Sequence, residues 1–111
     1  MTLYKIREYY YCNLCTGPRH WTLGLLLGEN GSDEGNPIIT IDPPIGKSKY
    51  GEIDSENVLV AVIDGFTAIN TGYRIKEIRY PKDDSIDPGG FKRCAFLIAQ
   101  KISDKSNWDL K

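Results

Sequence analysis

The hydrophobic residues of this chain change their spacing about half-way along the sequence. Up to residue 42 they alternate with other residues, as in Trp21, Leu23 and Leu25, which is the period of a β-strand. After residue 55 they recur every three or four residues, which is the period of an amphipathic α-helix. Strands followed by helices predict an α+β domain, in which a sheet packs against helices.

Three strands are predicted in the first half, over residues 3–14, 20–28 and 37–42. A Gly-Pro pair separates the first two strands. The polar, glycine-rich stretch 29–36 favours a hairpin loop between the second and the third. These two strands are therefore expected to pair with each other in antiparallel fashion.

The second half predicts a helix over 55–70, a strand over 73–80 and a helix over 88–103. Asp87 followed by proline is typical of a helix N-terminus. The apolar alternation slips between Ile75 and Ile78, which indicates a β-bulge or a twist. The predicted order is β-β-β-α-β-α, with an antiparallel sheet packed against two helices.

The length of 111 residues predicts a single domain, 1–111. A net charge of −1 with scattered basic residues argues against nucleic acid as a partner. The sequence shows neither a transmembrane segment nor the apolar region of a signal peptide. Three cysteines do not make a secreted disulfide framework, so we expect a cytoplasmic protein.

Cysteine and histidine gather in the stretch CNLCTGPRH. Cys12, Cys15 and His20 have the spacing of three zinc ligands, but Leu25 occupies the place of the fourth. A thioredoxin-like pair would begin a helix, whereas this pair ends a predicted strand. We therefore predict no metal and no cofactor, and a zinc-stabilised module is the weakest of the alternatives.

A second grouping brings together residues that are far apart in the sequence. Cys94 lies in the first turns of the last predicted helix, where the helix dipole favours a thiolate. His20 opens one strand of the predicted hairpin and Asp42 ends the other, so both would lie at the same end of the ladder. A cysteine, a histidine and an acid at one sheet edge would suit a thiol nucleophile, its base and a group that orients the base.

The stretch RHWTLGLLLG resembles the His-Trp strand of the permuted papain-like enzymes, the lecithin-retinol-acyltransferase-like relatives of the NlpC peptidases. In that group a histidine strand comes first, and a helix and a strand lead to a helix that carries the cysteine. The chain also resembles an uncharacterised fungal family with a His-Trp strand, a later acidic pair and a cysteine helix. The likeness covers about residues 19–102.

The resemblance implies a permuted papain-like fold and a cysteine hydrolase or acyltransferase acting on an amide, ester or thioester. Cys94 would attack the carbonyl, His20 would act as base and then acid, and Asp42 would orient His20. The relatives carry Asn-Cys-Glu-His-Phe and usually a second histidine. This chain has Arg-Cys-Ala-Phe around Cys94 and one histidine.

The substrate of such an enzyme would be a peptide, a protein or an acyl compound. The main alternative is a non-catalytic binding or inhibitory module with the same fold, whose surface would use the tyrosines at 9–11.

Overall fold

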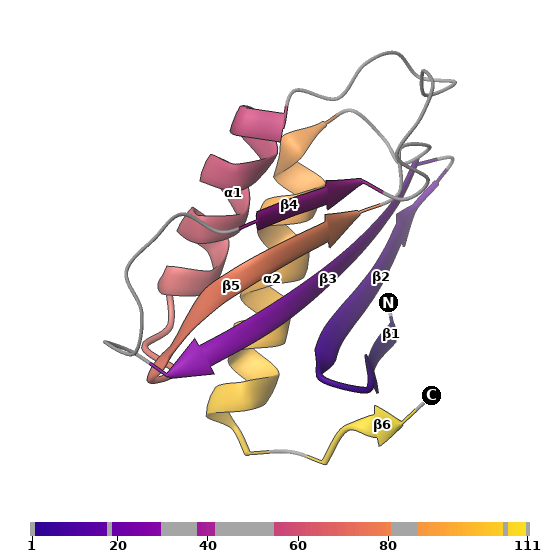
Figure 1. Ribbon diagram of the computed structural model, residues 1–111. Helices are drawn as coiled ribbons and strands as arrows, with labels where there is room; N and C mark the ends of the chain where they lie inside the picture. Colours follow the sequence, from indigo (N-terminus) through magenta and orange to yellow (C-terminus); the bar gives the residue numbers. More distant parts are fainter. Residues whose placement is uncertain are drawn as a thin grey trace.

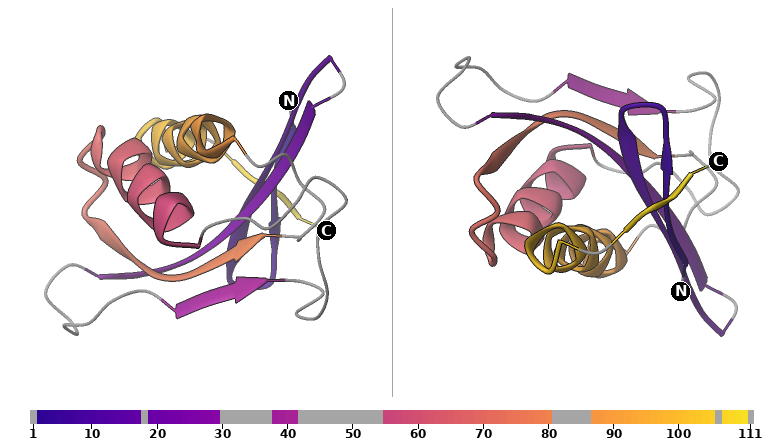
Figure 2. Two further views of the ribbon diagram at one scale, coloured as in Figure 1. Left: turned by 90° about the horizontal axis from the view of Figure 1, so that it is seen from above. Right: turned by 90° about the horizontal axis from the view of Figure 1, so that it is seen from below.

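The computed structural model describes residues 2–17, 19–29, 38–41, 55–80, 87–105 and 107–110. Within these ranges a twisted six-stranded sheet carries two helices (Figure 1). Figure 2 shows that both helices lie on one side of the sheet. The α+β class is therefore confirmed. In chain order the elements are β1 (Thr2–Ile6), β2 (Tyr9–Thr16), β3 (Arg19–Glu29), β4 (Ile38–Ile41), α1 (Ser55–Thr67), β5 (Tyr73–Tyr80), α2 (Pro88–Ser103) and β6 (Asp109–Leu110).

The sheet is mixed, with the strand order β4-β5-β3-β2-β1-β6. The four strands in the middle of this order pair with one another in antiparallel fashion. At the two edges β4 runs parallel to β5, and β6 runs parallel to β1. The sheet therefore departs at both edges from the antiparallel arrangement that the sequence predicts.

The prediction that β3 and β4 form a hairpin is wrong, because β5 lies between them. β4 and β5 are parallel neighbours, and parallel neighbours need a crossover connection. The helix α1 lies in the chain between these two strands. The alternation of apolar residues in β4 and β5 does not determine which strand each of them pairs with.

The predicted strand 3–14 is in fact the hairpin β1–β2. Its turn consists of Arg7 and Glu8, since Ile6 pairs with Tyr9, and Arg7 has a φ of 54°. Two-residue hairpin turns need such positive φ values and usually take them from Asn or Gly. Because neither residue is present at the turn, the sequence pattern gave no sign of it.

The local predictions for α2 and β5 are confirmed. α2 begins and ends where the sequence predicts, and the Asp87 carboxylate accepts a hydrogen bond of 2.9 Å from the Gly89 amide. On β5 the register shifts so that Lys76 is left between the partners of Leu26 and Leu27, which is the predicted bulge. α1 ends at Thr67, three residues before its predicted end.

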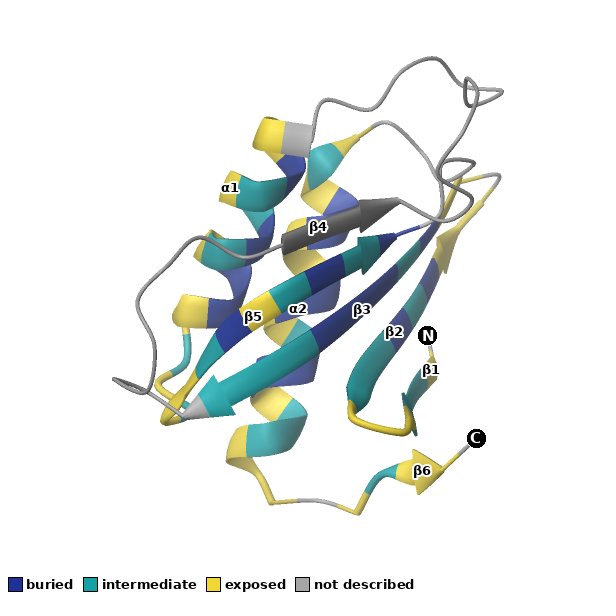
Figure 3. Cartoon of the chain, viewed as in Figure 1, coloured by how far each residue is buried: buried dark blue, intermediate teal, exposed yellow. Residues whose placement is uncertain are grey.

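The core lies between the helices and one face of the sheet (Figure 3). We call this the covered face and the opposite one the open face. Among the described residues no helix has both the length and the apolar composition that a membrane crossing needs. The buried hydrophobic residues are Cys12, Leu14, Trp21, Leu23, Leu25, Val58, Val62, Phe66, Ile75, Ile78, Tyr80, Phe91, Cys94, Ala95, Ile98 and Ala99.

Candidate functional site

Cys94 lies in the second turn of α2, on the side of the helix that packs on the sheet. It is completely buried, together with its helix neighbours Phe91 and Ala95. The thiol forms a side-chain hydrogen bond with Cys12 of β2. The position in the helix agrees with the sequence prediction, but the thiol points into the core.

His20 lies on the open face of the sheet. Its side chain is exposed, and its Nε2 is 3.5 Å from Thr22 Oγ1 on the same strand. Trp21, the next residue, is buried on the covered face, and successive side chains of a strand point to opposite faces. The sheet therefore separates the imidazole of His20 from the thiol of Cys94.

Asp42, the third predicted site residue, lies outside the described residues. Only a β3–β4 hairpin would bring it beside His20, and β5 separates those strands. The structure thus does not bring His20 and Cys94 together, and the expected pairing of Asp42 with His20 has lost its geometric basis.

The two cysteines of the CNLC stretch point to opposite faces of β2. Cys12 is completely buried and Cys15 is exposed. Cys15 pairs across the ladder with His20, so these two share the open face while Cys12 faces the core. In the part of the chain that the structure describes, no group of three Cys, His, Asp or Glu side chains is placed to hold a metal ion. The arrangement gives the zinc-stabilised alternative no support.

Trp21 connects the His-Trp strand to the beginning of α2. Its Nε1 donates a hydrogen bond of 2.9 Å to the Asp87 carbonyl oxygen. A Cβ atom on Gly90 would overlap the indole ring, so glycine is needed for the ring to lie against the helix. The tryptophan therefore has a structural role, because it anchors the N-terminus of α2 to β3.

The open face carries a group of three tyrosines. Tyr4 and Tyr11 stack with their ring centroids 5.4 Å apart and their planes 6° from parallel. Tyr9 lies beside Tyr11, with centroids 6.4 Å apart. The Tyr11 ring covers Gly24 of the neighbouring strand β3. A Cβ atom on Gly24 would overlap this ring. All three tyrosines are half-buried, so each presents part of its ring to solvent.

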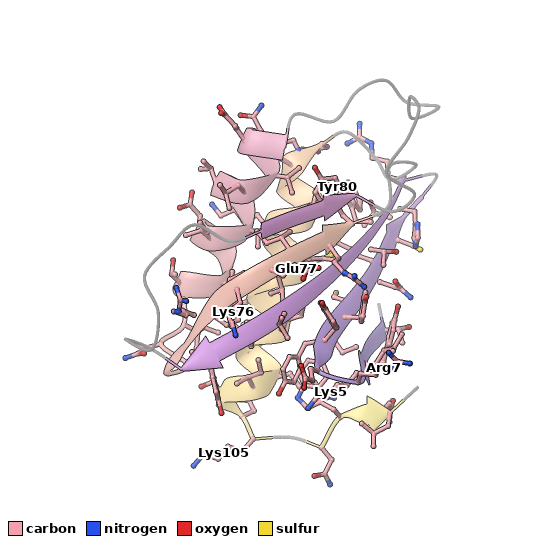
Figure 4. All side chains as sticks on the ribbon, in the orientation of Figure 1. Lys5, Arg7, Lys76, Glu77, Tyr80 and Lys105 are labelled. Carbon is pink, nitrogen blue, oxygen red and sulfur yellow. The ribbon has the colours of Figure 1, made fainter. Side chains whose placement is uncertain are left out.

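Two charged residues of β5 complete this group. Tyr9 donates a hydrogen bond of 2.9 Å from its hydroxyl to Glu77 Oε1, and Arg79 Nε donates one of 2.6 Å to Glu77 Oε2. The Arg79 guanidinium lies over the Tyr9 ring, 4.6 Å from its centroid, and hydrogen-bonds to Tyr11. Figure 4 looks onto this face and labels Glu77. We call Tyr4, Tyr9, Tyr11, Glu77 and Arg79 the tyrosine surface.

The contacts of the tyrosine surface shift the pKa values of its members. Burial raises the pKa of Tyr9, and the hydrogen bond to the negative Glu77 raises it further. Burial also raises the pKa of Tyr4, against the effect of its hydrogen bond with Asn13. The pKa of Arg79 is raised chiefly by its hydrogen bond to Glu77. Both tyrosines therefore remain neutral and Arg79 stays charged at neutral pH.

The run of tyrosines at 9–11 predicts only part of this surface. Tyr10 faces the other way, where it packs edge-on against Trp108 with centroids 4.8 Å apart. That run does not indicate Tyr4 or the charged pair of β5, which come from other strands. Strand alternation places Tyr10 on the opposite face from Tyr9 and Tyr11. Only the strand order shows that β5 is separated from β2 by a single strand, β3.

Comparisons with known protein families, with curated proteins and with solved structures found no match. The resemblance to permuted papain-like enzymes stays a prediction.

Proposed function

We propose that this chain is a protein-binding module and that the tyrosine surface is its binding site. The observation that carries the proposal is the contact geometry of the open face. Three half-exposed tyrosine rings and an arginine are held against one another on the side of the sheet away from both helices. Tyrosine and arginine are the residue types most often responsible for binding energy at protein interfaces.

The mutual contacts of these side chains lower the cost of binding. Arg79 is held by Glu77 and by the Tyr9 ring, and Tyr11 is held by Tyr4. Side chains that are already ordered lose little conformational entropy when a partner binds. Because the two charges of the surface compensate each other, a partner that offers apolar side chains and hydrogen-bonding backbone groups suits it best.

The cysteine hydrolase or acyltransferase implied by the resemblance needs the thiol of Cys94 beside the imidazole of His20. The two lie on opposite faces of the sheet, so no contact among the described residues favours that function over the binding module. The proposed partner is a peptide or a protein, and the proposed location is the cytoplasm.

Selection of binders from a phage-displayed random peptide library tests the proposal. Peptides enriched on the immobilised wild-type chain should bind Tyr11→Ala or Arg79→Ala at least roughly tenfold more weakly, as expected for central interface residues. Tyr73→Ala is the matched control, because Tyr73 is an exposed tyrosine of β5 outside the surface. Peptides that bind all three variants as tightly as the wild type would contradict the proposal.

Amide chemical-shift mapping gives a second readout that does not depend on variants. Addition of an enriched peptide should shift the resonances of β1, β2 and β5 around the tyrosine surface. Shifts confined to α1 and α2 would place the binding site on the helical side and overturn the assignment of the surface.

A further inference from the structure

Cys12 and Cys94 form a buried pair of thiols from two different elements. Cys12 belongs to β2 and Cys94 to α2, and both side chains are completely inaccessible to solvent. Both belong to the same core cluster between the sheet and α2, and the Cys94 side chain is the hydrogen-bond partner of the Cys12 thiol. Neither is part of a disulfide, so both are thiols in this structure.

We infer that Cys12 and Cys94 are a site of reversible oxidation, at which a peroxide converts the two thiols into an intramolecular disulfide that joins β2 to α2. The inference goes beyond the proposed binding function and does not rest on it. It follows from the contact between the two side chains across the core and from the different placement of the third cysteine.

The chemistry begins at Cys12. The hydrogen bond from Cys94 lowers the pKa of the Cys12 thiol from its ordinary value, and burial opposes this effect. The Cys12 thiolate attacks one oxygen of hydrogen peroxide, the O–O bond breaks, and hydroxide leaves, so that Cys12 becomes a sulfenic acid. The Cys94 sulfur then attacks the Cys12 sulfur, the S–O bond breaks, and water leaves with the thiol proton of Cys94. In total, two thiols and one hydrogen peroxide give one disulfide and two waters.

Burial and contact act on different steps of this sequence. Burial of both thiols slows the first step, because peroxide must penetrate the core or wait for a local opening. Contact with Cys94 speeds the second step, because the partner sulfur is already in place. A buried sulfenic acid at Cys12 should therefore be captured by Cys94.

Cys15 provides the internal reference. It is exposed on the open face, three residues along the same strand from Cys12 and on its opposite side. The folded strand thus prevents a bond between Cys12 and Cys15. In the unfolded chain the Cys12–Cys15 disulfide should form more readily than the Cys12–Cys94 disulfide. The short loop between residues 12 and 15 closes at a lower entropic cost than the long loop between 12 and 94.

The test is to treat the reduced full chain with hydrogen peroxide, once in native buffer and once in concentrated urea. Remaining thiols are alkylated with iodoacetamide, and the linked peptides are identified by mass spectrometry. The native sample should yield mainly the Cys12–Cys94 link, with Cys15 outside it. The urea sample should yield mainly other linkages. The natively oxidised chain should also unfold at a higher urea concentration than the reduced chain, and dithiothreitol should reverse this change.

Cys15→Ser is the informative variant, because it changes an exposed residue and leaves the buried pair intact. It should form the Cys12–Cys94 link as readily as the wild type. The inference is overturned if native oxidation modifies Cys15 while Cys12 and Cys94 remain free thiols. It is equally overturned if the Cys12–Cys94 link forms no more often in native buffer than in urea.

Discussion

The two faces of the sheet carry aromatic residues in different ways. On the covered face Tyr80 and Phe91 lie with their ring centroids 5.3 Å apart, and both are almost inaccessible to solvent. On the open face Tyr4 and Tyr11 stack at nearly the same centroid distance, 5.4 Å, but remain half-exposed. The distance between two rings therefore does not show whether they lie in the core or on the surface. The residues that surround the rings make that distinction.

Those neighbours have opposite character on the two faces. Phe91 is surrounded by apolar groups of the core, so its removal leaves a cavity. Tyr9 and Tyr11 are held by polar partners, Glu77 and Arg79, so their removal exposes groups that water can satisfy. The difference indicates that the covered face is responsible for the stability of the fold and leaves the open face available for binding.

Truncation of one aromatic residue on each face should produce the largest contrast. Phe91→Ala should lower the free energy of unfolding by about 3–5 kcal/mol, because a cavity forms in a close-packed core. Tyr11→Ala should lower it less, by about 1–2 kcal/mol, because the half-buried ring loses its stacking on Tyr4 and only part of a buried apolar area. Urea denaturation followed by circular dichroism measures both. Equal losses for the two variants would abolish the proposed division between the faces.

Addition of a methyl group beneath one ring on each face should give a smaller contrast. Gly90→Ala pushes a Cβ into the buried Trp21 ring, and overpacking of this kind costs about 1–3 kcal/mol. Gly24→Ala pushes a Cβ into Tyr11, whose half-exposed ring can move toward solvent, so the loss should stay below about 1 kcal/mol. Thermal unfolding compares the two. Greater damage from Gly24→Ala would show that the open face is as rigid as the core.

Alkaline pH should reduce the contribution of the open face to the free energy of unfolding, by less than the substitutions above do. The pKa values of Tyr4 and Tyr9 are raised in the folded chain, so the folded state holds these protons more tightly than the unfolded state. Their contribution to stability is fully present below about pH 10, the ordinary tyrosine value, and is lost as the pH rises through the raised values.

The measurement is urea denaturation between pH 8 and 11. Tyr9→Phe should flatten the decline in stability, because it removes one of the two protons that the folded state holds more tightly. An identical decline in Tyr9→Phe and the wild type would show that the contacts of Tyr9 do not hold its proton.

The smallest effect is expected for His20 on the reactivity of Cys94, because the two side chains lie on opposite faces of the sheet. His20→Ala should change the rate of Cys94 alkylation by less than about twofold between pH 5 and 9, because the imidazole does not face the thiol and cannot stabilise its thiolate. Cys15, which is exposed, should react much faster than Cys94 in both proteins. Mass spectrometry after iodoacetamide treatment gives the rates. A large slowing of Cys94 in the variant would bring back the cysteine–histidine pair predicted from the resemblance.

Part of the separation between His20 and Cys94 was already present in the sequence pattern. Trp21, Leu23 and Leu25 form the apolar side of their strand, and Cys94 lies on the apolar side of its helix. Two apolar sides pack against each other, and His20 lies on the opposite side from Trp21. The resemblance placed the two residues together, whereas the alternation of the strand separates them.

The sequence by itself determined the features that depend on near neighbours along the chain. The bounds of α2 follow from Asp87, Pro88 and the helical spacing of apolar residues, and the bulge of β5 follows from the slip between Ile75 and Ile78. Capping and side-chain periodicity act over a few residues, so a local pattern is sufficient to predict them.

Only the tertiary structure decided which strands are neighbours. The insertion of β5 between β3 and β4 ended the expected pairing of His20 with Asp42, and it also placed Glu77 and Arg79 within reach of Tyr9 and Tyr11. Strand order depends on contacts between segments far apart in the chain, and several orders bury the same apolar residues. An alternating pattern states which side of a strand is buried, but the packing of the whole sheet selects the strand beside it.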